Sequence, residues 1–348
     1  MALEHLLFLS LLLSFLITIV FTPRWIKKSQ KLGLLWEDMN KYKHPKNVAS
    51  SGGLIVIFGF VIGVLFYVAL RTFIIDGLST TIEIFALLCV VLILGLVGLV
   101  DDFFDIRKKK GNKIEVKGLS RRFRIFLALI ASIPLVVINA GAHIISVPFL
   151  GQLNLGLIYP LIIIPVGIVG STTVYNFLAG FNGLEAGMGV IILGFLSFIA
   201  YVTGSSWLAL IGLIMVASLI GFLMFNFYPA KVFPGDGLTY SVGALIAIMA
   251  ILGNFEKIAV FVFIPYIIEI TLKSRGGLKK HSFGEPQKDN SLELKYNKIY
   301  GITHLSIFIL KKFKKRVYEK DVVYFIWFFQ IAICLIALFI FKHDLFGI

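Results

Sequence analysis

The stretch LILGLVGLVDDFFDIRKKK, residues 92–110, is the starting point for interpreting the whole chain. An apolar run ends there in two adjacent carboxylates, Asp101 and Asp102. A third, Asp105, follows just before four basic residues at 107–110. If a helix continues through this end, Asp105 lies one turn from the other two and all three share a face. Like charges held that close repel one another, so they require a cation or a shared proton. The stretch is therefore a candidate metal site or a solvated helix end.

Composition places the chain among membrane proteins. It has 348 residues, of which 58% are hydrophobic and only 15% charged, and its mean hydropathy is +0.94. A soluble globular protein is nearer a quarter charged. We therefore expect an all-α, polytopic membrane helix bundle that forms one integral-membrane domain over residues 1–348. Cys89 and Cys334 both fall in apolar runs, which predicts neither a disulfide framework nor a cysteine-ligated metal.

Ten apolar segments are long enough to cross a bilayer, at about 20 residues each. We place them at residues 3–21, 52–70, 82–100, 123–140, 156–172, 186–203, 206–224, 237–253, 257–273 and 322–342. The fifth contains Pro160 and Pro165, so we expect it to be broken there. The first lacks a basic region before it and a clear cleavage site, which favours a retained span over a signal peptide.

Charge placement predicts the orientation of these spans. Ten spans put both termini on one side and five loops on the other. These loops are residues 22–51, 101–122, 173–185, 225–236 and 274–321. With the basic residues at their edges they hold 30 of the 33 Lys and Arg, so the positive-inside rule places them in the cytoplasm and both termini outside.

The basic face has two further implications. The net charge of +14 lies almost entirely on it, where it also attracts anionic lipid headgroups. The longest loop, residues 274–321, is expected to contain an ordered loop or small hairpin. Later in the same loop, residues 304–320 have apolar side chains beside a basic cluster, and this segment is a candidate for an interfacial amphipathic helix.

Three of the cytoplasmic loops carry oxygen ligands. The polar residues concerned are Asp101, Asp102 and Asp105 after the third span, Asn176, Asn182 and Glu185 in VYNFLAGFNGLEAG, and Asn226 and Asp236 in FNFYPAKVFPGDG. Carboxylates and amides together suit Mg²⁺, which completes its shell with water and phosphate oxygens. Nearby Lys and Arg suit phosphate. The pattern predicts a metal-assisted phosphoryl-transfer site or a phosphate-binding site at the membrane boundary. Asp105 and Glu185 are equally well explained as an ion-pair partner and a helix-start charge.

These strings resemble the polyprenyl-phosphate N-acetylhexosamine-1-phosphate transferases over nearly the whole chain. NFLAGFNGLEAG and FPGDG, with LWEDMNK and SIFILKK, are most similar to the eukaryotic and archaeal branch, the UDP-GlcNAc–dolichyl-phosphate GlcNAc-1-phosphotransferases. The resemblance implies that UDP-GlcNAc binds from the cytosol and that the phosphate of a membrane polyprenol attacks its β-phosphorus. UMP leaves, and polyprenyl diphosphate-GlcNAc, the first lipid-linked intermediate of N-glycan assembly, remains.

The resemblance also implies partners and a location. Besides UDP-GlcNAc and a polyprenyl or dolichyl phosphate, the partners are membrane lipids and a second copy of the chain in a homodimer. No nucleic-acid partner is expected. The protein would lie in the cell membrane, or in the endoplasmic reticulum membrane of a eukaryote, with its active site facing the cytosol.

Roles for the acidic residues follow from the same resemblance. Asp236 would be a ligand of Mg²⁺, with Mn²⁺ as the alternative ion, and Asn176 would lie beside it. Asp101 and Asp102 match the acidic pair of the family. One of them, with Asp101 favoured, would deprotonate or orient the lipid phosphate. A two-step route through an aspartyl intermediate is the competing mechanism. Asp105 would have a supporting role.

The resemblance likewise implies the substrate contacts, with some departures. Asn182 and Phe233 fall where the family holds the uridine, and Arg124 falls where a eukaryotic lysine meets the diphosphate. A first-loop glutamate of the eukaryotic enzymes has no counterpart in VASSGG, where Ser50 or Ser51 stands nearby. Of the Arg-His-Arg motif of the last loop, KKHSFG is the nearest match, so Lys279, Lys280 and His281 are candidates, and a loop role without a ligand is as good an explanation of His281.

Two alternatives to this function stay open on the sequence. The same reaction could use another UDP-N-acetylhexosamine for cell-wall or surface polysaccharide. The positions where this sequence departs from the family are those expected to contact the sugar and the diphosphate. A lipid or ion transporter would need polar groups near the bilayer midplane and repeated halves, and the sequence shows neither. Glu269, inside the ninth predicted span, has no role in either reading.

Overall fold

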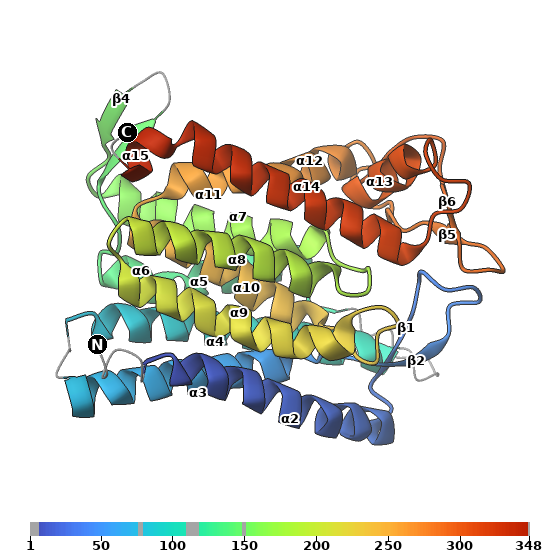
Figure 1. The fold of residues 1–348 in the computed structure, drawn as a ribbon, viewed down its shortest axis with the longest axis horizontal. Coiled ribbons are helices and arrows are strands. Elements are labelled where there is room, and N and C mark those ends of the chain that lie inside the picture. Colours follow the sequence, from blue (N-terminus) through green and yellow to red (C-terminus); the bar gives the residue numbers. More distant parts are fainter. Residues whose placement is uncertain (1–6, 76–78, 109–117, 148–150, 347–348) are drawn as a thin grey trace.

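A computed structural model describes residues 7–75, 79–108, 118–147 and 151–346. Within these ranges, eight helices are long and apolar enough to cross a membrane. They are α2 (Leu9–Leu32), α3 (Gly53–Leu70) with its continuation η1 (Arg71–Ile75), α4 (Thr81–Lys108), α7 (Ile164–Phe177) with the preceding turn η2 (Tyr159–Ile163), α8 (Leu184–Val202), α9 (Ser206–Asn226), α10 (Gly235–Gly253) and α14 (Glu319–Ile340). Figure 1 shows them side by side along the long axis of the molecule, which confirms a mostly helical membrane bundle.

Prolines divide the other two predicted spans. Residues 123–140 form α5 (Arg121–Ala131) and α6 (Ile133–Val137), and residues 257–273 form α11 (Glu256–Val262) and α12 (Ile264–Ser274). In each pair the second helix has a proline in its first turn, where the missing N–H leaves no hydrogen bond unmade. These two segments are therefore broken rather than continuous, and their crossing of the membrane stays a prediction.

The break expected in the fifth span at Pro160 and Pro165 is not observed, because residues 159–177 form one helix that changes its hydrogen-bond spacing instead. Pro160 lies in η2, a π-helical turn, and Pro165 lies in the first turn of α7. Proline cannot donate to the preceding turn, so the helix changes its hydrogen-bond spacing there instead of running straight. The α-helical part, α7, ends at Phe177, so Asn176 lies at the end of the bundle.

The N-terminal layer is held together by hydroxyl groups and glycines. The Thr18 and Ser218 hydroxyls of α2 and α9 lie 2.7 Å apart, and Ser218 also donates to the Val56 carbonyl of α3. A Cβ on Gly59 would come within 3.0 Å of Thr18 and of the α2 backbone. Small residues and interhelical hydrogen bonds replace the hydrophobic effect inside a membrane, so these contacts fasten the three helices together.

The centre of the bundle is α10, whose side chains are almost all buried and which packs against α4 and α7. Gly98 of α4 touches its first turn directly, because a Cβ there would come within 3.0 Å of the Asp236 backbone. This contact places the acidic end of α4 against the start of α10.

Replacement of Gly98 by alanine is therefore expected to destabilise the protein. The added methyl group would have to move backbone rather than a flexible side chain, which costs about 1–3 kcal/mol. Gly170→Ala in α7 is the matched control. It meets nothing within 4 Å and should be neutral or stabilising by about 0.5–1 kcal/mol. Thermal unfolding of the two purified variants measures the difference, and equal unfolding temperatures would contradict the close α4–α10 contact.

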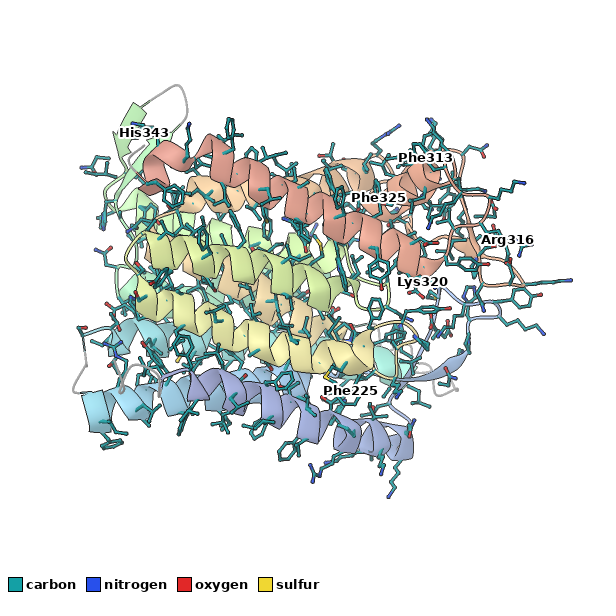
Figure 2. All side chains as sticks on the ribbon, viewed as in Figure 1. Phe225, Phe313, Arg316, Lys320, Phe325 and His343 are labelled. Carbon is teal, nitrogen blue, oxygen red and sulfur yellow. The ribbon has the colours of Figure 1, made fainter. Side chains whose placement is uncertain are left out.

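The two ends of the bundle carry different connections. At one end lie the antiparallel pairs β1 (Leu35–Glu37) with β2 (Lys46–Ala49) and β5 (Glu285–Pro286) with β6 (Leu292–Glu293); at the other lie β3 (Ile144–Val147), β4 (Gly151–Asn154) and α15 (Lys342–Phe346) (Figure 1). Figure 2 shows Arg316 and Lys320 at the β5–β6 end and His343 at the opposite end. The small hairpin expected in residues 274–321 is therefore confirmed.

The helix expected at 304–320 differs from the prediction. The observed helix, α13 (Ile302–Leu310), ends ten residues earlier and packs against α12 and α14. Ile302, His304 and Ile307 are buried, so much of this helix is packed within the protein rather than free to lie on a membrane surface. The basic residues that follow lie beyond its end.

Candidate active site

A cavity of about 350 Å³ lies at the β1–β2 end of the bundle. Its wall combines both signs of charge. The acidic residues on it are Glu37, Asp102, Glu185 and Asp236, and the basic ones are Arg121, Lys273, Lys279, Lys280 and His281. Ligand cavities are usually this size or larger and are concave with a few converging polar groups. A cavity lined by carboxylates and cations together suits a ligand that brings both phosphate and a metal ion.

Asp102 forms the wall where α4 meets α10. Its Oδ1 accepts the Asp236 N–H at 2.9 Å and so caps the start of α10, where a carboxylate is favoured by the free N–H groups of the first turn. Its buried Oδ2 has no hydrogen bond of good geometry to a described residue, although the Ser51 side chain lies near enough to interact. Gly235 has φ +72, and a Cβ there would collide with this carboxylate. Glycine is therefore required beside Asp102.

Asp101 is differently placed and does not line the cavity. Only 4% of it is exposed, and both of its oxygens are engaged. Oδ1 accepts the Leu119 N–H at 2.5 Å, and Oδ2 lies 2.8 Å from Arg124 Nη1. The residue thus fastens the segment before α5 to the end of α4. Of the adjacent pair, Asp102 is the one at the cavity wall.

Arg124 joins the acidic residues of two helices. Its Nη1 lies 2.8 Å from Asp101 Oδ2, 3.4 Å from Asp236 Oδ2 and 3.3 Å from the Tyr240 hydroxyl. One guanidinium therefore serves two carboxylates, while Asp102 stands beside them without a cationic partner among the described residues. Three carboxylates against one arginine leave an excess of negative charge, which favours either a proton or a bound cation.

Asn176 reaches the same place from α7. Its Nδ2 donates to the Thr239 hydroxyl at 3.0 Å, and that hydroxyl donates to the Asp236 carbonyl at 3.1 Å. Because the amide nitrogen is used in this way, its oxygen is the atom left to accept from a ligand or to coordinate a cation. The structure therefore brings Asn176 and Asp236 together, as the sequence predicted.

The oxygen ligands at this site suit Mg²⁺, which completes its shell with water and phosphate, better than a metal ion whose ligands all come from the protein. Among the described side chains, no group of three or more His, Cys, Asp and Glu residues is placed to hold a metal ion. Mg²⁺ commonly takes one or two carboxylates and fills its shell with water and substrate phosphate. Asp236, the Asn176 amide oxygen and the unpaired oxygen of Asp102 are of that kind.

The loop between α7 and α8 is held from both sides at Gly180. Its N–H donates to Glu185 Oε1 at 2.7 Å, and its carbonyl accepts from Asn40 Nδ2 at 2.7 Å. Gly180 has φ +124 and would meet Phe283 if it carried a Cβ. Glu185 lines the cavity, and its second oxygen has no partner among the described residues. Glu185 thus shapes the loop, and its second oxygen is buried.

Asn182 lies behind this loop rather than on the cavity wall. It is 1% exposed; its N–H donates to Glu319 Oε1 at 2.7 Å and its Nδ2 lies 3.4 Å from Asp38 Oδ2. Asn40 also donates to Glu319 Oε1, at 3.1 Å. Asn182 therefore links the loop through its side chain to Asp38, just after β1, and through its backbone to α14, and its predicted contact with uridine stays a prediction.

Phe233 lines the cavity and is fixed through its backbone. Its N–H donates to the Ala49 carbonyl at 2.8 Å, and its carbonyl accepts the Gly52 N–H at 2.9 Å. These two hydrogen bonds hold residues 49–52, including the cavity residue Ser50, against the start of α10. The place where the family's first-loop glutamate has no counterpart is thus part of the cavity wall.

The loop after α12 supplies Lys280 and His281, and both line the cavity. Lys280 Nζ lies 4.9 Å from the Tyr296 ring centroid and 4.7 Å from that of Tyr300, which is a cation–π arrangement. His281 stacks on Phe283 at 6.0 Å. The loop therefore presents its basic residues from an aromatic support. The side chain of Asp105, which was predicted to support the acidic pair, lies outside the described part of the structure.

His304 of α13 steadies this loop without facing the cavity. Its Nε2 lies 3.2 Å from the Phe283 carbonyl, and burial lowers the pKa of the imidazole. A neutral ring can donate from Nε2 while carrying no charge into the buried layer. The loop is thus held on its buried side by the neutral His304 ring, while Lys280 lies on its cavity side.

Sequence reasoning missed several residues in or beside the wall: Thr239, Lys273 and Arg121 line the cavity, and Tyr240 contacts Arg124 without lining it. Thr239 and Tyr240 follow Asp236 by three and four positions. Had a helix been assumed from Asp236 onward, this spacing would have placed them on the same face as Asp236. Lys273 follows Glu269 by four positions on α12, which the same spacing would have paired. Arg121, whose Nη2 donates to the Leu278 carbonyl at 2.8 Å, had no local signal.

The fold and the site together define a polytopic membrane protein whose polar cavity suits a phosphate-bearing ligand and a divalent cation. The sequence model of glycosyl transferase family 4 matches residues 84–254, from α4 to the end of α10. Two archaeal relatives share the provisional name UDP-N-acetylglucosamine–dolichyl-phosphate N-acetylglucosaminephosphotransferase. The one from Sulfolobus acidocaldarius is 34% identical over 94% of both chains. The one from Saccharolobus solfataricus is 35% identical over 94% of this chain and 95% of the relative.

A bacterial relative extends the comparison. A Bacillus subtilis protein, provisionally named undecaprenyl-phosphate N-acetylglucosaminyl 1-phosphate transferase, is 30% identical over 74% of this chain and 66% of its own. The match to the family model includes Asp101, Asp102, Asn176 and Asp236, which the structure brings to one end of the bundle. The chain belongs to glycosyl transferase family 4.

Proposed function

We propose that this protein transfers GlcNAc-1-phosphate from UDP-GlcNAc to a polyprenyl phosphate of the dolichyl type in the membrane, and releases UMP. The observation that carries the proposal is the convergence of Asp102, Asn176 and Asp236 at a cavity that also has five basic residues. The names of the two archaeal relatives, which match along 94% of this chain, support the choice of donor and acceptor. The product would be polyprenyl diphosphate-GlcNAc, the first lipid-linked intermediate of N-glycan assembly.

The chemistry is an in-line displacement at phosphorus. An oxygen of the lipid phosphate forms a bond to the β-phosphorus of the donor, and the bond from that phosphorus to the bridging oxygen breaks, so UMP departs. Asp102, at the cavity wall, orients the attacking phosphate or accepts its proton. Asp101 acts through Arg124, whose charge it holds beside Asp236. Such reactions rest on positioning and charge neutralisation more than on a strong base.

The cofactor of this proposal is Mg²⁺, with Mn²⁺ as the substitute, held by Asp236 and Asn176. The bound ion would neutralise charge on the diphosphate and so favour departure of UMP. Removal of divalent ions with EDTA is expected to abolish UMP release, and excess Mg²⁺ should restore it. Full activity after thorough chelation would contradict a metal requirement, and Ca²⁺ in place of Mg²⁺ serves as the matched ion control.

The cavity of this proposal faces the cytosol. The loops at its end hold almost all of the Lys and Arg of the chain, and Arg316 and Lys320 lie at that end in Figure 2. A nucleotide sugar made in the cytosol would then reach the cavity directly. The protein would act as a multi-pass enzyme of the cell membrane, or of the endoplasmic reticulum membrane in a eukaryote.

A panel of UDP-sugars tests the identity of the donor. With Mg²⁺ and a short polyprenyl phosphate, UDP-GlcNAc is expected to give the fastest UMP release, ahead of UDP-GalNAc, UDP-glucose and UDP-MurNAc-pentapeptide. Preference for a different N-acetylhexosamine would favour a role in cell-wall or surface polysaccharide and overturn the N-glycan assignment. The basic triplet at 279–281 makes this second outcome worth testing, because it replaces the family's Arg-His-Arg motif.

A further inference from the structure

Glu269 is a fully buried ionisable residue of α12 that the proposed reaction does not use. A carboxylate in such a place is costly unless it is paired, so it marks a site with a partner. One of its oxygens accepts the Ile302 N–H at the start of α13. The other lies 3.1 Å from Lys273 Nζ, close enough for an ion pair although the angle is poor for a hydrogen bond. Glu269 therefore joins α12 to α13 and holds Lys273.

Lys273 reaches from α12 to the end of α7. Its Nζ donates to the carbonyl of Phe177, the last residue of α7, and lies 5.5 Å from the centroid of the Phe177 ring. A cation is favoured at a helix C-terminus, where carbonyl groups lack partners. Phe177 directly follows Asn176, so the ammonium group lies beside the amide that is proposed to hold the cofactor. The contact fixes Lys273 against the polar end of the bundle.

The side chain of Lys273 also lines the cavity, with 18% of it exposed. An ammonium has three N–H donors; the Phe177 carbonyl takes one and the Glu269 carboxylate lies beside a second, so one donor remains for a ligand. A mostly desolvated charge interacts with an anion more strongly than a solvated one. Lys273 thus has both a free donor and the desolvated setting that an anion-binding residue needs.

Lys273 also differs from the other cations of the wall in what holds it. Arg121 donates to the Leu278 carbonyl and Lys280 rests on Tyr296 and Tyr300, so both are tied to the loop after α12. Lys273 is fixed instead by contacts to helical residues of α7 and α12. It is therefore the preorganised cation of the site among those with described contacts.

We propose that Lys273 binds the diphosphate of the nucleotide-sugar donor, and that Glu269 is the positioning residue that aims its ammonium group into the cavity. The inference rests on the proposed function, because it takes the donor to be a nucleoside diphosphate sugar. The rival explanation is that the Glu269–Lys273 pair only ties α7, α12 and α13 together. Phosphate-dependent binding separates the two, since a purely structural link would not distinguish ligands with and without phosphate.

The test compares UDP with uridine in binding titrations of the purified full-length protein with Mg²⁺. Lys273→Met is expected to weaken UDP binding about 10- to 100-fold, the loss of one charge-assisted hydrogen bond, and to leave uridine binding within about twofold. Lys273→Arg should recover most of the UDP affinity. Glu269→Gln keeps an acceptor for the Ile302 N–H and should weaken UDP binding by a smaller factor. Lys288→Met, an exposed lysine outside the cavity, is the matched control.

A double variant protects the test against misfolding. Lys273→Met alone leaves Glu269 buried and unpaired, whereas Glu269→Gln with Lys273→Met removes both charges. The double variant is expected to unfold near the wild-type temperature and still bind UDP poorly. Unchanged UDP affinity in the variants, or an equal loss for UDP and uridine, would overturn the proposal. If wild-type protein binds no UDP, the proposed function fails instead.

Discussion

Asp236→Asn is expected to lower kcat for UMP release by about 10²- to 10³-fold, the scale at which a single electrostatic group supports a transition state. The substitution keeps the size of the side chain and the backbone N–H that donates to Asp102. The first turn of α10 should therefore keep its structure. The substitution removes a carboxylate that lies beside both Asn176 and Arg124. Initial rates over a range of Mg²⁺ concentrations measure the effect.

Two features make the Asp236 result decisive. The variant should need more Mg²⁺ for half-maximal rate, because the proposed metal ligand has lost its charge. Asp289→Asn is the matched control, since Asp289 lies in the exposed β5–β6 hairpin and pairs with Arg316 away from the cavity. Turnover and Mg²⁺ dependence like those of wild type in Asp236→Asn would contradict the assignment of this residue to the active site.

The second large effect is expected at Asp102, with a contrast to Asp101. Asp102→Asn should lower kcat by about 10²-fold with little change in unfolding temperature, because the amide oxygen can still accept the Asp236 N–H. Asp101→Asn should lower stability as well, since it weakens the charge-assisted bond to Arg124, a loss of about 1.5–3 kcal/mol. The same preparations provide both readings, by UMP release and by thermal unfolding.

The contrast matters because the sequence alone favoured Asp101 for the contact with the lipid phosphate. The structure places Asp102 at the cavity wall and engages both oxygens of Asp101. An Asp101→Asn variant that unfolds like wild type yet loses all turnover would return the catalytic role to Asp101. Leu119→Ala is no substitute test, because the bond to Asp101 comes from the Leu119 backbone.

Much of the fold was predictable because hydrophobic length is a strong local signal. Eight of the ten predicted spans correspond to continuous helices long and apolar enough to cross a membrane, and at Pro160 and Pro165 the helix changes from π to α spacing without a break. The two other segments are divided before Pro134 and Pro265. The mean hydropathy of a segment does not reveal such a break, because one proline at a helix start changes the hydrogen bonding without lowering the hydrophobicity.

The site was predictable where its residues follow the ends of spans. Asp102, Asn176 and Asp236 come from three separate loops, and one-sided topology alone requires these loops to share an end of the bundle. Which carboxylate faces the cavity depends on tertiary partners such as Leu119 and Arg124, which no local pattern specifies. Asn182 shows the same limit, because its partners Asp38 and Glu319 lie more than a hundred residues away.

The central claim is that the chain transfers a phosphosugar rather than a sugar, and the leaving nucleotide reports on it directly. Purified protein is supplied with UDP-GlcNAc labelled in the β-phosphate, a polyprenyl phosphate and Mg²⁺, and the nucleotide and lipid products are separated and identified by mass. The account predicts UMP in equal amount to a polyprenyl diphosphate-GlcNAc that carries the labelled phosphate. Release of UDP with an unlabelled lipid-linked sugar would contradict it.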